Sequence, residues 1–293
     1  MKNNHFLAVM TFLITMGYSM VQVSTNNDES ITSQPGTLFK ISRTGNADSY
    51  LYAISHSADA TTTQVHPNIN AILDEVEGVA MELKMDDPNL QQNIMKHIGM
   101  KDGQKLSSIY TKEQFTEVDE FFVKTLGAGL SNFETFKPMA LQSYLLPSFL
   151  GNQVFSFETV LITTATQKGK PLLGLETVEN QLAAFDTFDY NRQAEILYQM
   201  VKNDADLKQQ YIAVNEAYDA GNMGEVYAIT QSILGTSGCK AIFDERNDQL
   251  AMQISEQTAQ QPLLIALGAG HFGGSNGLLK LLQQKGFSIS PIK

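Results

Sequence analysis

The sequence predicts an α/β fold with a central mixed sheet formed by strand-helix-strand units from both ends of the chain. A large helical insertion separates the two units. In the first unit, an apolar strand runs from Tyr50 towards His56, and a helical stretch and a second strand at residues 78–83 follow. In the second unit, a strand at residues 263–268 leads to His271, then to a helix and a last strand. Two such units with helices between them favour one intertwined domain.

The elements of the first unit have clear local signals. Residues 37–42 and 49–54 flank a turn at Gly45 and Asn46, which predicts a β-hairpin. Residues 67–76 begin with Pro67 and carry apolar side chains at helical spacing, and a short strand then ends at Glu82.

The middle of the chain is mainly helical in pattern. Residues 157–167 are ambiguous, because their length suits a helix but they are rich in β-branched side chains. Residues 171–175 predict a compact strand that runs into Glu176. The expected helices cover residues 88–150, with a new start near Pro138, residues 191–234, with breaks at 204–206 and 221–224, and the segment after Phe243.

The composition is that of a folded globular protein. Of the 293 residues, 43% are hydrophobic and 17% are charged, which is enough for a full core. The net charge of -11, without clusters of Lys and Arg, argues against nucleic acid as a partner.

The amino terminus predicts export. An apolar run at residues 6–16 follows a short polar start, so residues 1–24 are interpreted as a signal peptide, against an uncleaved anchor or a buried helix. Residues 25–36 are polar and predict a flexible linker, and residues 37–293 form the folded domain. We expect a periplasmic or secreted protein with no membrane span after cleavage. The single cysteine, Cys239, excludes an internal disulfide and is more consistent with a structural thiol than with a nucleophile.

Four strand ends and one arginine carry the candidate chemistry. Ligands gather at the carboxyl ends of strands in open α/β sheets, so His56 and His271 are expected to face one crevice. Glu82 and Glu176 end two further apolar strands, where a carboxylate is costly unless it is paired or bound to a metal. Together these residues suit a divalent ion or an acid and base pair, and Arg246 suits a carboxylate or an oxyanion.

Simpler interpretations remain open for the same residues. A histidine at a strand end can be held by hydrogen bonds alone, and Arg246 can pair with the adjacent Asp244 and Glu245. The glycine-rich loop around His271 has no Gly-Lys-Ser/Thr sequence, which disfavours a phosphate site.

The motifs, in their order, resemble the TraB/GumN (TraB/PrgY) family, which is similar to the Tiki metalloproteases and more remotely to the erythromycin esterases. The resemblance extends from about Leu38 to the carboxyl end. The family's motifs correspond here to Ala53-Ile-Ser-His56, Glu82, Gly174-Leu-Glu176-Thr with Gln181, Glu245-Arg246-Asn247, and Gly268-Ala-Gly-His271. Two positions depart from the family pattern. Ala53 replaces a glycine and loses access to positive φ, and Glu158 replaces a shorter aspartate.

The resemblance implies a metal-dependent hydrolase, most simply a peptidase acting on peptide or amide bonds. It implies Mn²⁺, Co²⁺ or Zn²⁺ held by His56 and His271 with Glu82 or Glu176, and Arg246 acting on the substrate's charge or the oxyanion. Which glutamate is ligand and which is base stays open, as do the natural substrate, whether a peptide or another small molecule, and the oligomeric state. The alternatives are a protein of this fold that binds a peptide or metal without turnover, and a metal-free esterase with a histidine base.

Overall fold

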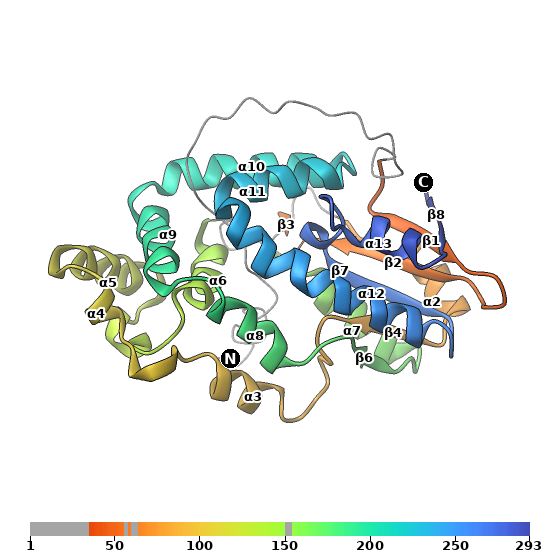
Figure 1. Cartoon of the computed structure of the whole chain (residues 1–293), viewed down its shortest axis with the longest axis horizontal. Helices are drawn as coiled ribbons and strands as arrows, with labels where there is room; N and C mark the ends of the chain where they lie inside the picture. Colours follow the sequence, from red (N-terminus) through yellow and green to blue (C-terminus); the bar gives the residue numbers. More distant parts are fainter. Residues whose placement is uncertain (1–34, 56–57, 60–63, 150–153) are drawn as a thin grey trace.

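The computed structural model describes residues 35–55, 58–59, 64–149 and 154–293 (Figure 1). The predicted signal peptide, most of the predicted linker and His56 lie outside the described residues, so these expectations stay predictions. No described helix combines the length and apolar character needed to cross a membrane.

A six-stranded mixed sheet forms the centre of the fold, which confirms the predicted α/β class. Its strands, in spatial order, are β6 (Leu172–Gly174), β4 (Gly78–Met81), β7 (Leu263–Gly268), β2 (Ser49–Ile54), β1 (Leu38–Ser42) and β8 (Ser288–Pro291). The first four run parallel, and β1 is antiparallel to both β2 and β8. A separate two-stranded sheet pairs β3 (Ala58–Asp59) with β5 (Val154–Phe155).

Strand β7, from the far end of the chain, lies between β2 and β4. Its six residues are all buried, as are those of β2, which explains why both sequences are apolar without alternation. Ile54 pairs with Gly268, and Met81 pairs with Ala266. The register therefore brings the carboxyl ends of β4, β7 and β2 to one edge of the sheet.

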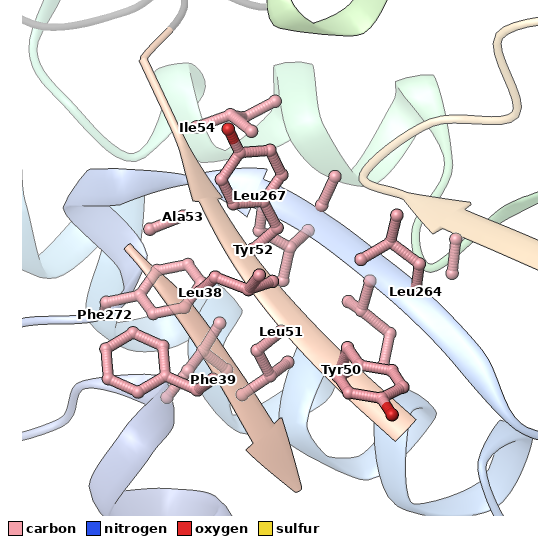
Figure 2. Close-up of a cluster of buried hydrophobic side chains, with 14 of the residues drawn as sticks. Leu38, Phe39, Tyr50, Leu51, Tyr52, Ala53, Ile54, Leu264, Leu267 and Phe272 are labelled. Atoms are coloured by element: carbon pink, nitrogen blue, oxygen red, sulfur yellow. The ribbon is translucent and has the colours of Figure 1, made fainter. Parts of the chain in front are cut away.

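Helices cover both faces of this sheet. On one face, Tyr50 reaches Glu75 at the end of α2 (Ile69–Glu75), and Tyr52 packs edge-on against Phe157 of α7 (Phe157–Gln167). On the other face, Phe39 stacks on Phe272, which precedes α13 (Leu278–Gln284). Figure 2 shows these side chains on β1 and β2, where neighbours in the sequence alternate between the two faces.

The ambiguous segment at residues 157–167 is a helix. Ser156 caps it by accepting a hydrogen bond from the Thr159 amide, and Phe157, Leu161 and Ala165 are buried at a spacing of one helical turn. Burial along this stripe outweighs the β preference of the remaining side chains.

The predicted helical insertion is confirmed and has its own apolar core beside the sheet. A break at Asn203 separates α9 from α10, and another at Gly221, with φ of 69°, separates α10 from α11. The insertion contains α3 (Leu90–His97), α4 (Leu106–Ile109), α5 (Lys112–Leu126), α6 (Pro138–Phe149), α8 (Val178–Asp186), α9 (Tyr190–Lys202), α10 (Asp204–Asp219) and α11 (Met223–Cys239). A π-helical turn, η4 (Lys240–Asp244), joins α11 to α12 (Glu245–Gln257), which packs against α13.

Candidate functional site

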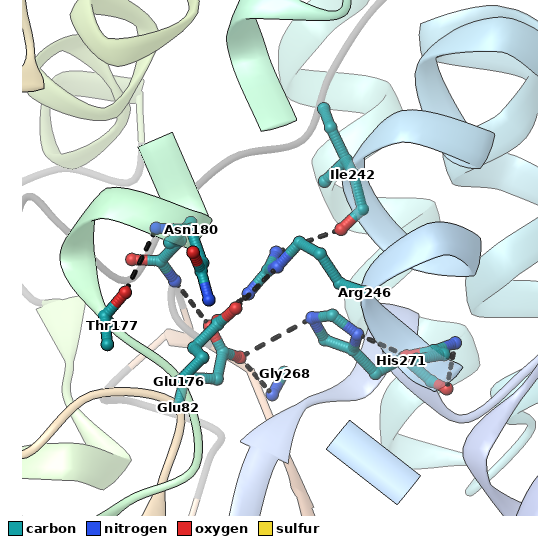
Figure 3. A network of polar contacts seen from close by, with 10 residues as sticks. Glu82, Glu176, Thr177, Asn180, Ile242, Arg246, Gly268 and His271 are labelled. Carbon is teal, nitrogen blue, oxygen red and sulfur yellow. Dashed lines mark hydrogen bonds and ion pairs between the residues drawn. The ribbon is translucent and has the colours of Figure 1, made fainter. Parts of the chain in front are cut away.

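Four of the five predicted site residues come together at the carboxyl edge of the sheet. Glu82 follows β4, and His271 ends the short 3-10 turn η5 (Ala269–His271) that follows β7. Glu176 lies between β6 and α8, and Arg246 lies in the first turn of α12. Figure 3 shows their side chains pointing towards one another. His56 lies outside the described residues, so its meeting with His271 stays a prediction.

Glu82 is a buried carboxylate, with 5% of its surface exposed. Its Oε1 accepts a hydrogen bond from the backbone amide of Gly268 at 3.1 Å. Its Oε2 accepts from Gln181 Nε2 at 2.8 Å and from Arg246 Nη2 at 3.3 Å. These donors compensate the loss of hydration that burial of a carboxylate entails.

Arg246 and Glu176 form a bidentate pair. Arg246 Nε donates to Glu176 Oε2 at 3.1 Å, Nη2 donates to Glu176 Oε1, and Nη1 donates to the Ile242 carbonyl at 2.9 Å. The carboxylate partners of Arg246 are thus Glu82 and Glu176, from distant strand ends, and not the adjacent Asp244 and Glu245.

Charge and burial act in opposite directions on this pair. Burial alone would lower the pKa of Arg246, but the charges of Glu176 and Glu82 outweigh it and raise that pKa above its usual value. Burial raises the pKa of the Glu176 carboxyl and Glu82 adds to the rise, while Arg246 opposes it. Arg246 therefore stays charged and holds two carboxylates that would otherwise repel each other.

Asn247 sets the orientation of the His271 ring. Its Nδ2 donates to the carbonyls of His271 at 3.1 Å and Asn276 at 2.8 Å, so its Oδ1 is the atom that faces His271 Nδ1 at 2.6 Å. Nδ1 must then carry the proton. In the neutral ring the lone pair is on Nε2, which lies 3.7 Å from Glu82 Oε1. Phe243 contacts the ring edge-on at a centroid distance of 5.0 Å.

The glycines after His271 allow close packing. A Cβ on Gly273 would lie 2.2 Å from the Met223 carbonyl oxygen, and one on Gly277 would lie 2.3 Å from that of Phe272. Only glycine permits the close approach to α11 at Gly273 and the tight fold of the loop on itself at Gly277. Packing thus accounts for these two glycines.

The two departures from the family pattern are accommodated differently. Ala53 lies inside β2 and has a negative φ, and Gly268 of the second motif has φ of -53°. The backbone therefore needs no positive φ at Ala53, and the replacement of glycine by alanine introduces no strain at this position. Glu158, buried in the first turn of α7, lines with Glu82 a hollow of about 10 Å³, which is about the space of one water molecule.

Gln181 and Asn247 are site residues whose roles the sequence analysis did not assign. Gln181 is 3% exposed and Asn247 is fully buried, although both lie on helices with exposed polar faces. An amide on the apolar stripe of an amphipathic helix is the signal that could have identified them, since a buried amide needs partners.

Some of the side chains at this site are placed so that they could bind a metal ion. Glu82 Oε1 and His271 Nε2, 3.7 Å apart, can both reach one ion, because carboxylate and imidazole ligands bind at about 2.0–2.2 Å. Both oxygens of Glu176 face Arg246, which makes Glu176 the weaker candidate. The described residues, which exclude His56, contain no group of three or more His, Cys, Asp or Glu side chains placed to hold a metal.

Comparisons with known proteins agree with the motifs. No curated protein and no solved structure matches the chain significantly. The profile of the TraB/PrgY/gumN family matches residues 37–291, which include both strand-helix-strand units, the helical insertion and every residue of the site. The chain therefore belongs to the TraB/PrgY/gumN family.

Proposed function

We propose that this protein is a metal-dependent hydrolase that acts on peptide or amide bonds, in the periplasm or outside the cell after removal of residues 1–24. The observation that carries the proposal is the pair formed by Glu82 and His271. Both side chains are almost fully buried, and their facing atoms lie 3.7 Å apart at the carboxyl ends of adjacent parallel strands.

The surroundings of this pair support a ligand role. The proton that Asn247 holds on Nδ1 leaves Nε2 of His271 as the coordinating atom, and hydrogen bonds to the remote imidazole nitrogen are typical of metal-ligating histidines. Gln181 and Arg246 hold Glu82 through Oε2, so that Oε1 faces the imidazole. We propose His56 as the third ligand. A bound divalent ion would supply an activated water and polarise the scissile carbonyl.

Arg246 has a positioning role in this proposal. Three of its five N–H groups point to carboxylates and a fourth to the Ile242 carbonyl, so it lacks the free face needed to bind a substrate carboxylate. Its hydrogen bonds hold the Glu82 and Glu176 side chains in place.

Metal binding tests the ligand set directly. The full chain, Glu82→Gln and His271→Ala would be titrated with Mn²⁺, Co²⁺ and Zn²⁺ by calorimetry, with His97→Ala of α3 as the matched control. We expect each site variant to lose at least about tenfold in affinity while the control is unchanged. Wild-type affinity in His271→Ala would exclude this ion site.

Turnover separates the enzyme from the alternatives. A peptide library would be incubated with metal-loaded protein and read by mass spectrometry. Cleavage products that disappear with a chelator and with Glu82→Gln support the proposal. Cleavage that a chelator leaves unchanged indicates a metal-free reaction, and retention of intact peptides indicates a binding protein; either result rejects the proposal.

A further inference from the structure

A hollow of about 240 Å³ opens beside the Arg246–Glu176 pair. It lies between α8 on one side and η4 and the start of α12 on the other, and both residues of the pair contribute to its wall. Arg246 Nη2 also contacts Glu82 Oε2 at 3.3 Å, and the Glu176 backbone amide donates to the Glu82 carbonyl at 2.9 Å. The hollow therefore borders the candidate site and shares Glu176 and Arg246 with it.

The apolar part of the hollow is lined by small side chains. Ala183 and Ala184 of α8 face Ala241 of η4, and Leu250 of α12 completes this surface. This volume lies below the range of about 300–1,000 Å³ that is typical of pockets for drug-sized ligands. An occupant must therefore be narrow and carry short side chains.

The polar part of the hollow offers amides. Asn180 of α8 and Gln249 of α12 line it, are exposed, and make no side-chain hydrogen bond within the described part of the chain. An amide side chain can donate to a carbonyl and accept from an N–H, which is the pattern that a peptide backbone presents.

The charge of the lining restricts the occupant further. Glu176 and Glu245 carry negative charge and Arg246 carries positive charge, so the lining has a net charge of -1. Glu245 is 53% exposed and its nearest cation, Lys240, is 3.9 Å away. This negative charge disfavours ligands that carry a free carboxylate or a phosphate, and it does not disfavour an uncharged peptide segment.

We propose that this hollow is a substrate subsite that takes an uncharged, extended peptide segment of small residues such as Ala, Gly or Ser. The proposal rests on the hydrolase function proposed above and assigns its substrate class. Peptides with bulky or acidic residues at this position bind poorly, because the alanines leave no room and Glu245 repels negative charge.

Binding of a defined probe tests the subsite without any turnover. The probe is N-acetyl-dialanine amide, added to the metal-free full chain and followed through the ¹⁵N side-chain amide signals of Asn180 and Gln249. We expect both signals to shift on titration and Ala183→Phe to weaken binding at least about tenfold. Ala213→Phe, on a partly buried face of α10, is the matched control and should bind as the wild type does.

The results separate the two proposals. Probe binding at Asn180 and Gln249 without cleavage of any peptide keeps the subsite and rejects the hydrolase. Metal-dependent cleavage that treats Ala and Phe peptides alike, and that Ala183→Phe leaves unchanged, keeps the hydrolase and overturns the subsite. A probe that shifts neither amide signal, or that binds Ala183→Phe as tightly as the wild type, also overturns the subsite. With cleavage present, we expect Ala183→Phe to raise KM about tenfold for small-residue peptides at nearly constant kcat.

Discussion

Asn247 Oδ1 lies 2.6 Å from Nδ1 of His271. Arg246, the residue that precedes Asn247 in the chain, binds the two buried carboxylates of Glu82 and Glu176. Successive helical residues point about 100° apart, so the first turn of α12 reaches the carboxylates with one side chain and the imidazole with the next. A π-helical turn precedes this segment, and such turns are frequent at functional sites. The start of α12 therefore positions both the two carboxylates and the His271 imidazole.

Asn247→Leu should release the His271 ring. Without the acceptor Oδ1 the Nδ1 proton loses its partner, and two carbonyls lose their donor, so we expect a cost of about 1–3 kcal/mol in the free energy of unfolding. The ¹⁵N spectrum of the neutral His271 ring should show the proton on Nδ1 in the wild type and a tautomer mixture in the variant. A wild-type ring protonated on Nε2 would contradict this assignment.

Arg246→Met should be strongly destabilising, because it leaves two buried carboxylates without their cation. We expect a loss of about 3–5 kcal/mol in urea unfolding. Lys40→Ala is the control, since its pair with Asp48 is 43% and 45% exposed and should contribute less than about 1 kcal/mol. Equal losses in the two variants would show that the buried pair does not hold the site together.

Gly273→Ala should disrupt the loop that carries His271, since its Cβ would overlap the Met223 carbonyl. We expect a loss of at least about 2 kcal/mol, measured by thermal unfolding. Gly45→Ala is the control. Gly45 has a positive φ, but an added Cβ would contact nothing, so this change should lower the free energy of unfolding by only about 1 kcal/mol. A smaller effect at Gly273 than at Gly45 would argue against close packing of this loop.

Asp186, the last residue of α8, should make the free energy of unfolding depend on pH. Burial raises the pKa of Asp186, but hydrogen bonds from Tyr190, Lys137 and Lys101 outweigh it and lower the pKa below 3.8. The stabilisation is therefore complete above pH 3.8 and is lost as the pH falls through the folded-state pKa. Asp186→Asn should cost about 1–3 kcal/mol at pH 7 and much less near pH 2.5, measured by urea unfolding. A constant difference between the two pH values would contradict the assignment.

Cys239 should be inert in the folded protein. Burial, with the charge of Asp244 adding to it, raises the pKa of this thiol to about 12. At pH 8 we expect an aromatic disulfide reagent to react about a thousandfold more slowly than with the urea-unfolded chain. Rapid reaction of the folded protein would reveal an accessible thiolate and reopen a nucleophilic role.

Much of the fold follows from local patterns. The apolar runs at β2 and β7 predict strands, and the stripe in α2 predicts a helix, because side-chain periodicity reflects which face is buried. Polar residues that end such runs, here Glu82, Glu176 and His271, mark strand ends. Local patterns did not decide between helix and strand for residues 157–167, because their β-branched side chains favour a strand while their buried stripe has helical spacing.

The sequence by itself determined the α/β class, the helical insertion and the strand-end side chains that meet in the site. Only the tertiary structure decided the partners: Arg246 with Glu82 and Glu176 instead of its neighbours, Asn247 with His271, and Gln181 with Glu82. The physical reason is that these contacts depend on strand order and on how α8 and α12 pack over the sheet edge. Spacing along the chain encodes which face of an element is buried, but not which distant element covers it.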